Sequence, residues 1–321
     1  MKPLVIAVTG ASGFIGRALV DHFHVNGHRV RVLIHRDDLD RDVEKFYGSL
    51  LDSGVLGGFL KGADVLFHLA SALGSRMIPE AEFFRINRDG TAAVLQAALD
   101  HRVNKVVHFS SAGVYGRTSG LIPLKESDEL HPVDTYERSK MEGERAVQAF
   151  SGRLDVSVIR PGWVYGEGDT RTFKLIRQIE SGFFFIAGSG RVMHSPIHVG
   201  DLVRLADIIA CRGEKGEVYN GGGDPLSVRV MVEVIASLLN RRILPVRVPL
   251  ALLEPPALLL EKVFALWNRE AHLNSSRLAF FKRGKPLDNR KVRDEFGFQP
   301  EFDFRQGIKK AVAWYRDRGW L

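Results

Sequence analysis

The sequence predicts an α/β fold, a doubly wound parallel sheet with a smaller C-terminal lobe. Strand-like and helix-like segments alternate through the first two-thirds of its 321 residues. A glycine-rich turn directly follows the first apolar run, at the point where a strand ends and a helix begins. Such alternation is typical of parallel sheets that carry helices on both faces. A chain of this length can bury a sizeable core, as one large domain or as a domain with an appendage.

Each element follows from a local pattern. Short apolar runs predict buried strands at residues 4–8, 30–34, 64–70, 106–110 and 156–160. Helical periodicity predicts a helix after Gly13 and further helices at residues 82–100, 135–150 and 305–318. Residues 37–45 form a charged connection, and the apolar residues 246–267 are broken by prolines.

The glycine turn is the segment Thr9-Gly-Ala-Ser-Gly-Phe-Ile-Gly16. Its first glycine permits a sharp turn, its second leaves room for a phosphate, and its third lets the helix pack on the strand. The first helical N–H groups then face the anion. The spacing is G-x-x-G-x-x-G rather than G-x-G-x-x-G, and the flanking strand and helix favour a dinucleotide site. Its candidate residues are Gly10, Ser12, Gly13, Phe14, Ile15 and Gly16.

We therefore expect a dinucleotide-binding domain over residues 1–165, with sheet segments that continue to about residue 225. Residues 166–321 are expected to form mainly a substrate-binding lobe, interleaved with that domain. This lobe should close over the carboxyl edge of the sheet, where open α/β sheets bind ligands.

Composition is that of an ordinary soluble protein, with 45% hydrophobic and 26% charged residues. The single cysteine, Cys211, excludes an internal disulfide framework, fits the cytoplasm, and is expected to be a small core residue. Because the first strand is predicted to start at Leu4, we expect no signal peptide. No apolar run is long enough to span a bilayer.

The net charge of +7 is unevenly placed, because residues 267–321 hold 13 Lys or Arg against 7 Asp or Glu. No aromatic interleaving or known nucleic-acid module accompanies this charge, so we expect no nucleic-acid partner. A solvated basic face is the default interpretation, and an anionic substrate or a membrane surface is the alternative.

Tyr136 and Lys140 lie one turn apart on the same face of the helix predicted at residues 135–150. An ammonium beside a phenol favours the phenolate and lowers a pKa that starts at about 10. Such a phenol can transfer a proton at neutral pH. Ser111 closes the preceding strand, so its hydroxyl could hold a substrate oxygen against the phenol. Taken alone, Tyr136 and Lys140 would be an ordinary pair on a helix surface, and Ser111 would be an ordinary cap or turn residue. Together with the glycine turn, the three residues predict a hydride-transfer site.

These residues belong to an ordered series of motifs. They are residues 9–16, His68-Leu-Ala70, Ile86-Asn-Arg-Asp-Gly-Thr91, Ser110-Ser-Ala-Gly-Val-Tyr-Gly116, Tyr136-Glu-Arg-Ser-Lys140, Arg160-Pro-Gly-Trp-Val-Tyr-Gly166 and Pro196-Ile-His-Val-Gly-Asp201. In this order and spacing the chain resembles an extended short-chain dehydrogenase/reductase of the NAD-dependent epimerase/dehydratase family, with a Rossmann-type sheet. That family includes nucleotide-sugar epimerases and dehydratases and 3β-hydroxysteroid dehydrogenases.

The resemblance implies a small-molecule substrate and a role for each matching residue. Tyr136 would exchange a proton with the substrate oxygen, and Ser111 would polarise that oxygen. Lys140 would lower the pKa of Tyr136 and hydrogen-bond the nicotinamide ribose. His198 is expected to be structural rather than catalytic, since buried polar groups usually serve networks.

Further cofactor residues follow from the same resemblance. Asn87 would support the site from the helix beneath it, and Leu69 and Ala70 would line the adenosine side. Leu50 is also assigned to the cofactor site, and Pro161 to its nicotinamide side. No metal site is expected.

The end of the second strand bears on the choice of cofactor. Family members that prefer NAD carry an acidic residue there, which bonds the ribose 2′-hydroxyl. This chain has Ile34 at that position, followed by Arg36, whose guanidinium would bind a 2′-phosphate. NADP(H) is therefore the preferred cofactor, and NAD(H) stays possible because Asp37 and Asp38 follow. Ser49 stands where the family usually has an aspartate against the adenine.

Two departures from the family bear on the substrate. Nucleotide-sugar enzymes commonly have Asn where this chain has Trp163, and Arg where it has His194. Arg191, which is nearby in the sequence, could substitute for one of these two missing residues. Residues 246–267 are rich in Leu, Phe and Pro, which suits a lobe that faces an apolar ligand, although each residue also suits plain packing. These observations favour hydride transfer to or from a secondary alcohol or ketone of a largely apolar, sterol-like substrate.

Two other functions stay open. One is a nucleotide-sugar 4-epimerase or dehydratase with the same Ser-Tyr-Lys triad. The other is a non-catalytic NADP(H)-binding sensor, although such relatives usually lose the Tyr or the Lys that this chain keeps. Family members often dimerise through two helices that match residues 82–100 and 135–150, so a homodimer is expected.

Overall fold

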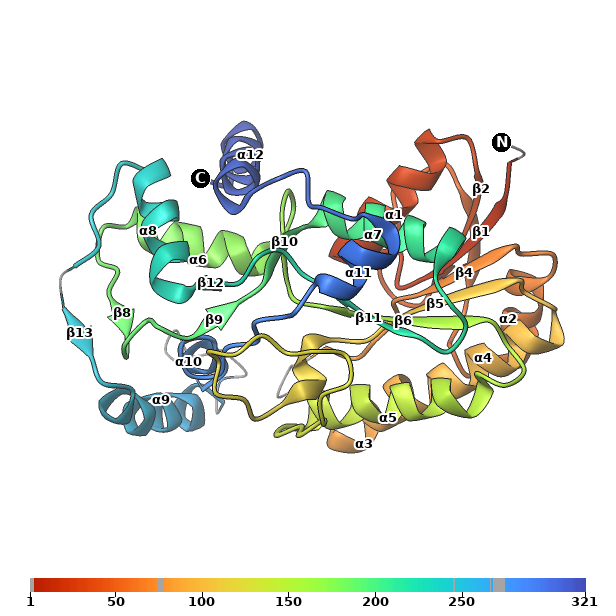
Figure 1. Ribbon diagram of the computed structural model, residues 1–321, viewed down its shortest axis with the longest axis horizontal. Helices are drawn as coiled ribbons and strands as arrows, with labels where there is room; N and C mark the ends of the chain where they lie inside the picture. Colours follow the sequence, from red (N-terminus) through yellow and green to blue (C-terminus); the bar gives the residue numbers. More distant parts are fainter. Residues whose placement is uncertain (1–2, 74–77, 245, 266, 268–274) are drawn as a thin grey trace.

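The structure, a computed structural model, describes residues 3–73, 78–244, 246–265, 267 and 275–321. Its centre is a seven-stranded parallel sheet in the order β11-β6-β5-β4-β1-β2-β3 (Figure 1). From β1 the chain builds the sheet first toward β3 and then, in the opposite direction, from β4 toward β11. The reversal between β1 and β4 leaves a crevice of the kind in which open sheets bind ligands. The predicted doubly wound parallel sheet is confirmed.

The sheet strands are β1 (Val5–Thr9), β2 (Arg29–Ile34), β3 (Glu44–Tyr47), β4 (Val65–His68), β5 (Lys105–Phe109), β6 (Val156–Pro161) and β11 (Val218–Gly221). The short strand β3 begins inside the segment expected to be a charged connection, which corrects that expectation. Its residues are half-buried or exposed, and Glu44 bonds Arg31 at 3.0 Å on the neighbouring strand. An edge strand pairs on one side alone and tolerates charges, so it shows no apolar run.

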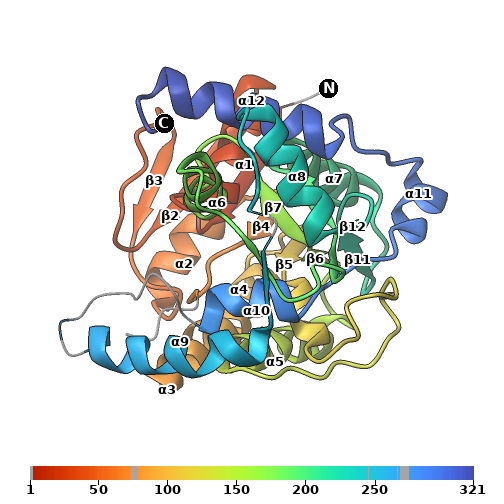
Figure 2. The ribbon, with the colours of Figure 1, turned by 90° about the vertical axis from the view of Figure 1, so that its left-hand side faces the viewer.

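Helices cover the two faces of the sheet (Figure 2). The helices α1 (Phe14–Val25) and α7 (Val199–Arg212) lie on one face, and α2 (Ser53–Leu60), α4 (Thr91–Asp100) and α5 (Thr135–Phe150) lie on the other. Successive strand residues alternate between the two cores, because side chains along a strand point to opposite faces. In β1, for example, Ile6 and Val8 pack under α1 and α7, whereas Ala7 packs on the other side.

The helix predicted at residues 82–100 is divided into three parts. It consists of α3 (Glu80–Phe84), the π-helical segment η1 (Arg85–Gly90) and α4. A π-helical segment inserts an extra residue into a helix and is frequent at functional sites. Asn87 lies within this segment and is buried.

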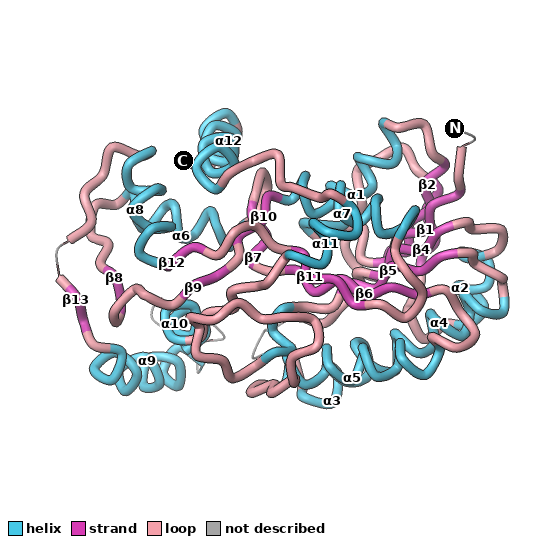
Figure 3. Tube along the Cα trace, viewed as in Figure 1, coloured by secondary structure: helices cyan, strands magenta, loops and turns pink. Residues whose placement is uncertain are grey.

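Most of the remaining elements form the part of the molecule beyond the C-terminal ends of the strands (Figure 3). They are η2 (Ala112–Tyr115), β7 (Trp163–Tyr165), α6 (Thr170–Glu180), β8 (Ile186–Ala187), β9 (Met193–His194), β10 (Pro196–His198), β12 (Leu226–Ser227), α8 (Val228–Leu238), β13 (Arg247–Val248), α9 (Leu250–Ala265), α10 (Ser275–Lys282) and α12 (Phe304–Asp317). Helix α11 (Arg290–Phe296) instead packs beside β11 and adds Val292 to the core on the α7 side of the sheet. A third apolar core joins α6, α8 and α12 around Met231 and Ile308. No helix of the described residues is long and apolar enough to cross a bilayer.

Helix α9 corrects the expectation that prolines break the apolar segment. It continues through Pro255 and Pro256. Proline removes a backbone donor and leaves the carbonyl four residues earlier without its helical partner. Those carbonyls belong to Ala251 and Leu252, both exposed residues, so water can satisfy them.

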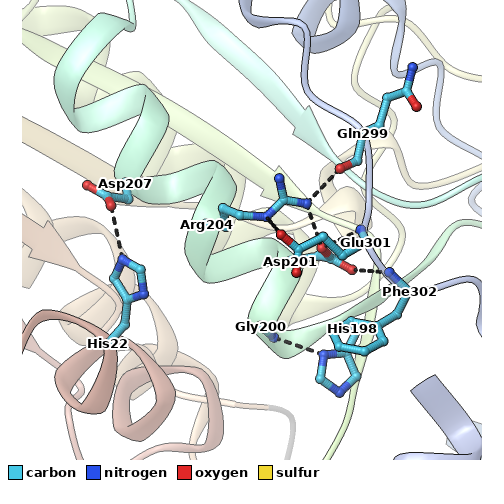
Figure 4. A network of polar contacts seen from close by, with 9 residues as sticks. All are labelled: His22, His198, Gly200, Asp201, Arg204, Asp207, Gln299, Glu301 and Phe302. Carbon is cyan, nitrogen blue, oxygen red and sulfur yellow. Dashed lines mark hydrogen bonds and ion pairs between the residues drawn. The ribbon is translucent and has the colours of Figure 1, made fainter. Parts of the chain in front are cut away.

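A buried aspartate in the first turn of α7 holds the segment before α12 (Figure 4). Asp201 accepts the N–H groups of Glu301 at 2.8 Å and Phe302 at 3.2 Å. It also accepts a bond from Arg204 at 2.8 Å, and the same guanidinium donates to the Gln299 carbonyl at 2.6 Å. These contacts fix the C-terminal chain on α7.

His198 and Cys211 were expected to be a structural residue and a core residue, respectively. His198 is buried and accepts the Gly200 N–H at 3.2 Å (Figure 4). Its other ring nitrogen lies 2.9 Å from Glu167. Cys211, on the other hand, is exposed near the end of α7 rather than a core residue. Cys211 lies one helical turn after Asp207 on the outer side of α7, and its thiol is 4.0 Å from the Asp207 carboxylate.

Candidate active site

The glycine turn has the backbone that the sequence predicts. Gly10 has φ +71°, and a Cβ there would lie 2.6 Å from the Ala70 nitrogen on the loop after β4. A Cβ on Gly16 would collide with the Gly10 carbonyl oxygen. A Cβ on Gly13 would lie 3.2 Å from the Gly10 carbonyl oxygen, a tight contact, and no side chain caps the N-terminus of α1. The N–H groups at this end of α1 are therefore available to an anion.

A cavity of about 580 Å³ extends from this turn along the ends of β1, β4, β5 and β6. The predicted site residues that line it are Gly10, Ser12, Gly13, Phe14, Ile15, Gly16, Arg36, Leu50, Leu69, Ala70, Ser111, Tyr136, Lys140, Pro161 and Trp163. Three predicted residues do not line it: Asn87, Arg191 and His194. The cavity thus contains the expected cofactor residues and the expected catalytic residues together.

Ser111 and Tyr136 meet on the wall of this cavity. The Ser111 hydroxyl caps η2 by accepting the Gly113 N–H at 3.0 Å. Burial raises the pKa of Tyr136, and the nearby Ser111 hydroxyl and the charge of Arg171 offset only part of that rise. This direction is opposite to the predicted lowering by Lys140. The Lys140 ammonium instead donates to the Phe109 carbonyl at 2.5 Å.

Lys140 lines the cavity and is almost fully buried. Burial lowers its pKa to about 8, and the charge of Glu144 opposes that change. Burial and the Lys140 charge together lower the pKa of His68 to about 3 and keep the pKa of His108 well below its usual range. Both imidazoles are therefore neutral at pH 7. Within the described chain, the ring nitrogens of His108 and the hydroxyl of Ser110 have no hydrogen-bond partner.

The buried ammonium makes a testable contribution to stability. The pKa of Lys140 is about 8 in the folded protein and 10.5 as the ordinary value, so between these values the unfolded chain binds the extra proton. Stability from this group therefore rises with pH. The free energy of unfolding of the wild type, minus that of Lys140→Met, should increase by about 2 kcal/mol between pH 7.5 and 9.5. Urea unfolding at both pH values measures this.

The exposed lysine Lys61 offers the matched control, Lys61→Met, for which the same difference should stay flat. A difference for Lys140→Met that is equally flat would contradict the burial of a charged amine at this position.

Asn87 supports the site from behind. Its amide oxygen accepts from the Ala72 N–H at 2.8 Å and the Ser71 hydroxyl at 3.0 Å. Its amide nitrogen donates to the Ser139 hydroxyl at 2.8 Å, which in turn donates to the Tyr136 carbonyl at 2.8 Å. Asn87 therefore joins the loop after β4 to the turn of α5 that carries Tyr136.

The three expected substrate residues are separated. Trp163 lines the cavity and packs on Phe280 of α10, with ring centroids 5.3 Å apart. His194 stacks on the same Phe280 ring, with ring centroids 4.6 Å apart, and donates to the Phe280 carbonyl at 2.9 Å. Arg191 is exposed outside the cavity. Neither Arg191 nor His194 therefore lines the cavity, because Arg191 is exposed and His194 is buried against Phe280.

Sequence reasoning missed several charged residues of the cavity. Arg171 lines it from the start of α6, and the Arg85 guanidinium, also in the lining, binds both oxygens of Glu82 at 2.6 and 2.7 Å. The Arg85 pair reads in the sequence as an ordinary surface pair three residues apart. Arg171 carried a weak signal, since a basic residue in the first turn of a helix opposes the helix dipole.

The part of the cavity lined by Arg36 carries charges of both signs, because Arg85, Asp37 and Glu82 line it as well. The hydrogen bond and charge of Arg85, together with the charges of Arg36 and His35, lower the pKa of Glu82. Among the described residues, Arg36 forms no ion pair or hydrogen bond. Asp38 bonds Lys45 at 3.2 Å and does not line the cavity, whereas Asp37 does. One of the two aspartates that follow Arg36 is thus directed away from the site.

Comparison with known proteins places this geometry in a family. Residues 6–222, more than half of the chain, match the model of the NAD dependent epimerase/dehydratase family. The chain belongs to this family. It is an extended short-chain dehydrogenase/reductase, as its motifs predict, and the family consists of enzymes.

Relatives show how the epimerase/dehydratase family varies. The chain is 31% identical over 318 residues to the 4-hydroxy-2-methyl-3-oxo-4-farnesyl-3,4-dihydroquinoline-1-oxide ketoreductase of Stigmatella aurantiaca, covering 94% of this chain and 93% of the relative. It is 30% identical over 336 residues to sterol demethylase protein B of Methylococcus capsulatus, covering 98% and 99%. The solved structure of MoeE5 in complex with UDP-glucuronic acid and NAD is 28% identical, with a TM-score of 0.77 over 98% and 99% of the two chains.

Proposed function

We propose that this enzyme is an NADP(H)-dependent oxidoreductase that interconverts a ketone and a secondary alcohol on a largely apolar, lipid-like substrate. The observation that carries the proposal is that Ser111, Tyr136 and Lys140 share one cavity with the glycine turn. The open N-terminus of α1, the bare backbone at Gly13 and the unpaired Arg36 fit a dinucleotide with phosphate groups.

When bound, the nicotinamide cofactor would supply a hydride to the carbonyl carbon or accept one from the carbinol carbon. Tyr136 would donate its phenolic proton to the carbonyl oxygen during reduction, and Ser111 would hydrogen-bond the same oxygen. The buried Lys140 charge would favour the phenolate that remains on Tyr136. Because burial raises the pKa of Tyr136, the phenol is protonated at neutral pH and suited to reduction.

The lipid-like substrate is supported by apolar residues in the lining of the cavity. Leu73, Ile78, Trp163 and Val164 are among them, as is common in sites for apolar ligands. The two relatives named for a farnesyl quinoline and for sterol demethylation point to the same substrate class.

Arg171 favours one alternative, a nucleotide-sugar epimerase or dehydratase, because its guanidinium could bind a diphosphate in the cavity. The solved relative with UDP-glucuronic acid belongs to that class. A non-catalytic NADP(H) sensor is the remaining alternative.

Cofactor consumption distinguishes the three functions. The purified protein would be incubated with NADPH and either a panel of apolar ketones or a panel of UDP- and dTDP-sugars. Net oxidation of NADPH by a ketone supports the proposal. Conversion of a nucleotide sugar without net cofactor change would instead support an epimerase or dehydratase. Tight cofactor binding with no turnover of either panel would support a non-catalytic sensor.

The proposed preference for NADP(H) gives a second prediction. Replacing Arg36 with alanine should raise KM for NADPH by about 10- to 100-fold, because a charge-assisted bond to the 2′-phosphate is lost. KM for NADH should stay nearly constant. The control is Arg41→Ala, which removes an exposed arginine of the same connection that pairs with Asp21 outside the cavity. An unchanged ratio of the two Michaelis constants in Arg36→Ala would contradict the role of Arg36.

A homodimer through the helices at residues 82–100 and 135–150 rests on the family resemblance alone. Phe83, Val94 and Leu95, which could have formed its apolar face, are buried within the chain itself. A cytoplasmic location likewise rests on the single cysteine.

A further inference from the structure

Helix α9 is apolar on its outer face as well as on its inner face. Toward the molecule, Leu253 and Ala257 pack in a small core with Leu278 of α10. Away from it, Leu252, Pro255, Pro256 and Leu259 follow the spacing i, i+3, i+4, i+7 and form one exposed stripe. The exposed fractions of Leu252 and Leu259 are 67% and 63%. We call these four residues the outer stripe.

A surface helix of a water-soluble protein normally presents charged residues on its outer side. Helix α9 has three charged residues, of which Glu261 is buried and Glu254 bonds Lys282 of α10 at 2.5 Å. Lys262 remains as the exposed charge near its end, and Trp267 follows with 65% of its surface exposed. Contiguous exposed apolar surface of this kind marks a site that another apolar surface covers.

The outer stripe lies close to the candidate active site. Helix α10 packs against α9, and its Phe280 contacts Trp163 in the cavity lining at 5.3 Å. Figure 2 shows α9 along the lower margin of the molecule, next to α10. One helix therefore separates the outer stripe from the wall of the cavity that is proposed to hold an apolar substrate.

The charge around α9 indicates what covers the outer stripe. Residues 241–285 contain nine Lys or Arg and three Glu, a net charge of +6 out of +7 for the whole chain. Arg241, Arg242, Lys262 and Lys282 are exposed. A second copy of the chain would bring the same positive charge to the interface, whereas an anionic lipid surface attracts it.

We propose that α9 lies in the plane of an anionic lipid bilayer, with the outer stripe among the acyl chains. Its 16 residues span about 24 Å, less than the roughly 30 Å of a hydrocarbon core, so the helix lies in the surface and does not cross. Trp267 and Lys262 then reach headgroup level, where tryptophan and lysine are favoured. This inference rests on the proposed function, because a lipid-like substrate dissolves in the bilayer and the membrane-bound α9 would bring the cavity close to it.

Vesicle co-sedimentation tests this placement without any assay of turnover. The full chain would be mixed with vesicles of equal parts phosphatidylglycerol and phosphatidylcholine, or of phosphatidylcholine alone. We expect binding to the anionic vesicles and at least tenfold weaker binding to the neutral ones. Substituting Leu259→Glu should weaken binding to the anionic vesicles at least tenfold, because it places a carboxylate in the outer stripe.

The matched control is Val25→Glu, which adds the same charge at an exposed apolar residue at the end of α1. It should bind vesicles like the wild type. Failure of the wild type to bind anionic vesicles, or equal binding by Leu259→Glu, would overturn the proposal. A dimer that Leu259→Glu converts to a monomer, seen by light scattering, would assign the outer stripe to a second copy instead. Each of these results leaves the oxidoreductase activity to be judged separately.

Discussion

Tyr136→Phe should lower kcat for ketone reduction by about 10²- to 10⁴-fold, the usual contribution of a positioned general acid. The phenylalanine ring keeps the shape of the cavity wall and removes the hydroxyl near Ser111. Since burial raises the pKa of Tyr136, the wild-type phenol is protonated at neutral pH. Reduction should therefore vary little with pH near neutrality, and oxidation of the alcohol should rise as pH increases toward the phenol pKa.

Steady-state kinetics measure kcat and its pH dependence, and a fluorescence titration with NADPH measures cofactor affinity. Cofactor affinity of Tyr136→Phe should stay close to that of the wild type, because Lys140 and the glycine turn are retained. Tyr47→Phe is the control, since Tyr47 is an exposed tyrosine on β3 outside the cavity. A Tyr136→Phe enzyme with a kcat within about tenfold of the wild type would remove this phenol from the chemistry.

The second large effect concerns stability. Arg160 on β6 and Glu144 on α5 form a two-bond ion pair at 3.0 and 2.7 Å, with side chains only 5% and 4% exposed. The Arg160 guanidinium also lies 4.9 Å from the ring centre of Tyr115. Glu144→Leu should reduce the free energy of unfolding by about 3–5 kcal/mol, because it leaves the Arg160 charge buried without its partner.

Urea denaturation of single and double variants measures this loss. Combining Glu144→Leu with Arg160→Met should recover most of the stability, because the unpaired charge is then removed as well. On the same helix, Glu142 pairs with the exposed Arg145 at 2.6 Å, so Glu142→Leu should cost less than about 1 kcal/mol. Equal losses for the two glutamate variants would show that the Arg160 pair does not stabilise the attachment of α5 to β6.

Elements with a strong local pattern were predicted closely. Helix α5 has the predicted bounds, 135–150, because Asp134 caps its first turn and its apolar and polar residues follow the helical period. The glycine turn after β1 was equally clear, since a positive φ at Gly10 and close approach at Gly16 exclude other residues. Local sequence is sufficient where the backbone itself imposes the residue type.

Elements that depend on neighbours were predicted poorly. The edge strand β3 has no apolar run of its own and exists because β2 offers it a hydrogen-bonding partner. His194 and Arg191 were placed in the substrate site by their distance along the chain from a motif. Packing of His194 on Phe280, 86 residues later, directs it elsewhere. The lowered pKa expected for Tyr136 is wrong for a similar reason: burial of the phenol raises its pKa, and the Phe109 carbonyl accepts a hydrogen bond from the Lys140 ammonium.

The order of strands and helices, the dinucleotide turn and the spacing of Tyr136 and Lys140 on one helix face were determined by the sequence itself. Each depends on residues within a few positions of one another, where backbone geometry leaves few choices. Only the tertiary structure decided that Arg171 reaches the cavity, that Glu144 buries its charge against Arg160, and that α9 presents an apolar outer stripe. Those features arise from packing between segments distant in the chain, and no local pattern specifies which side chains such packing will enclose or leave exposed.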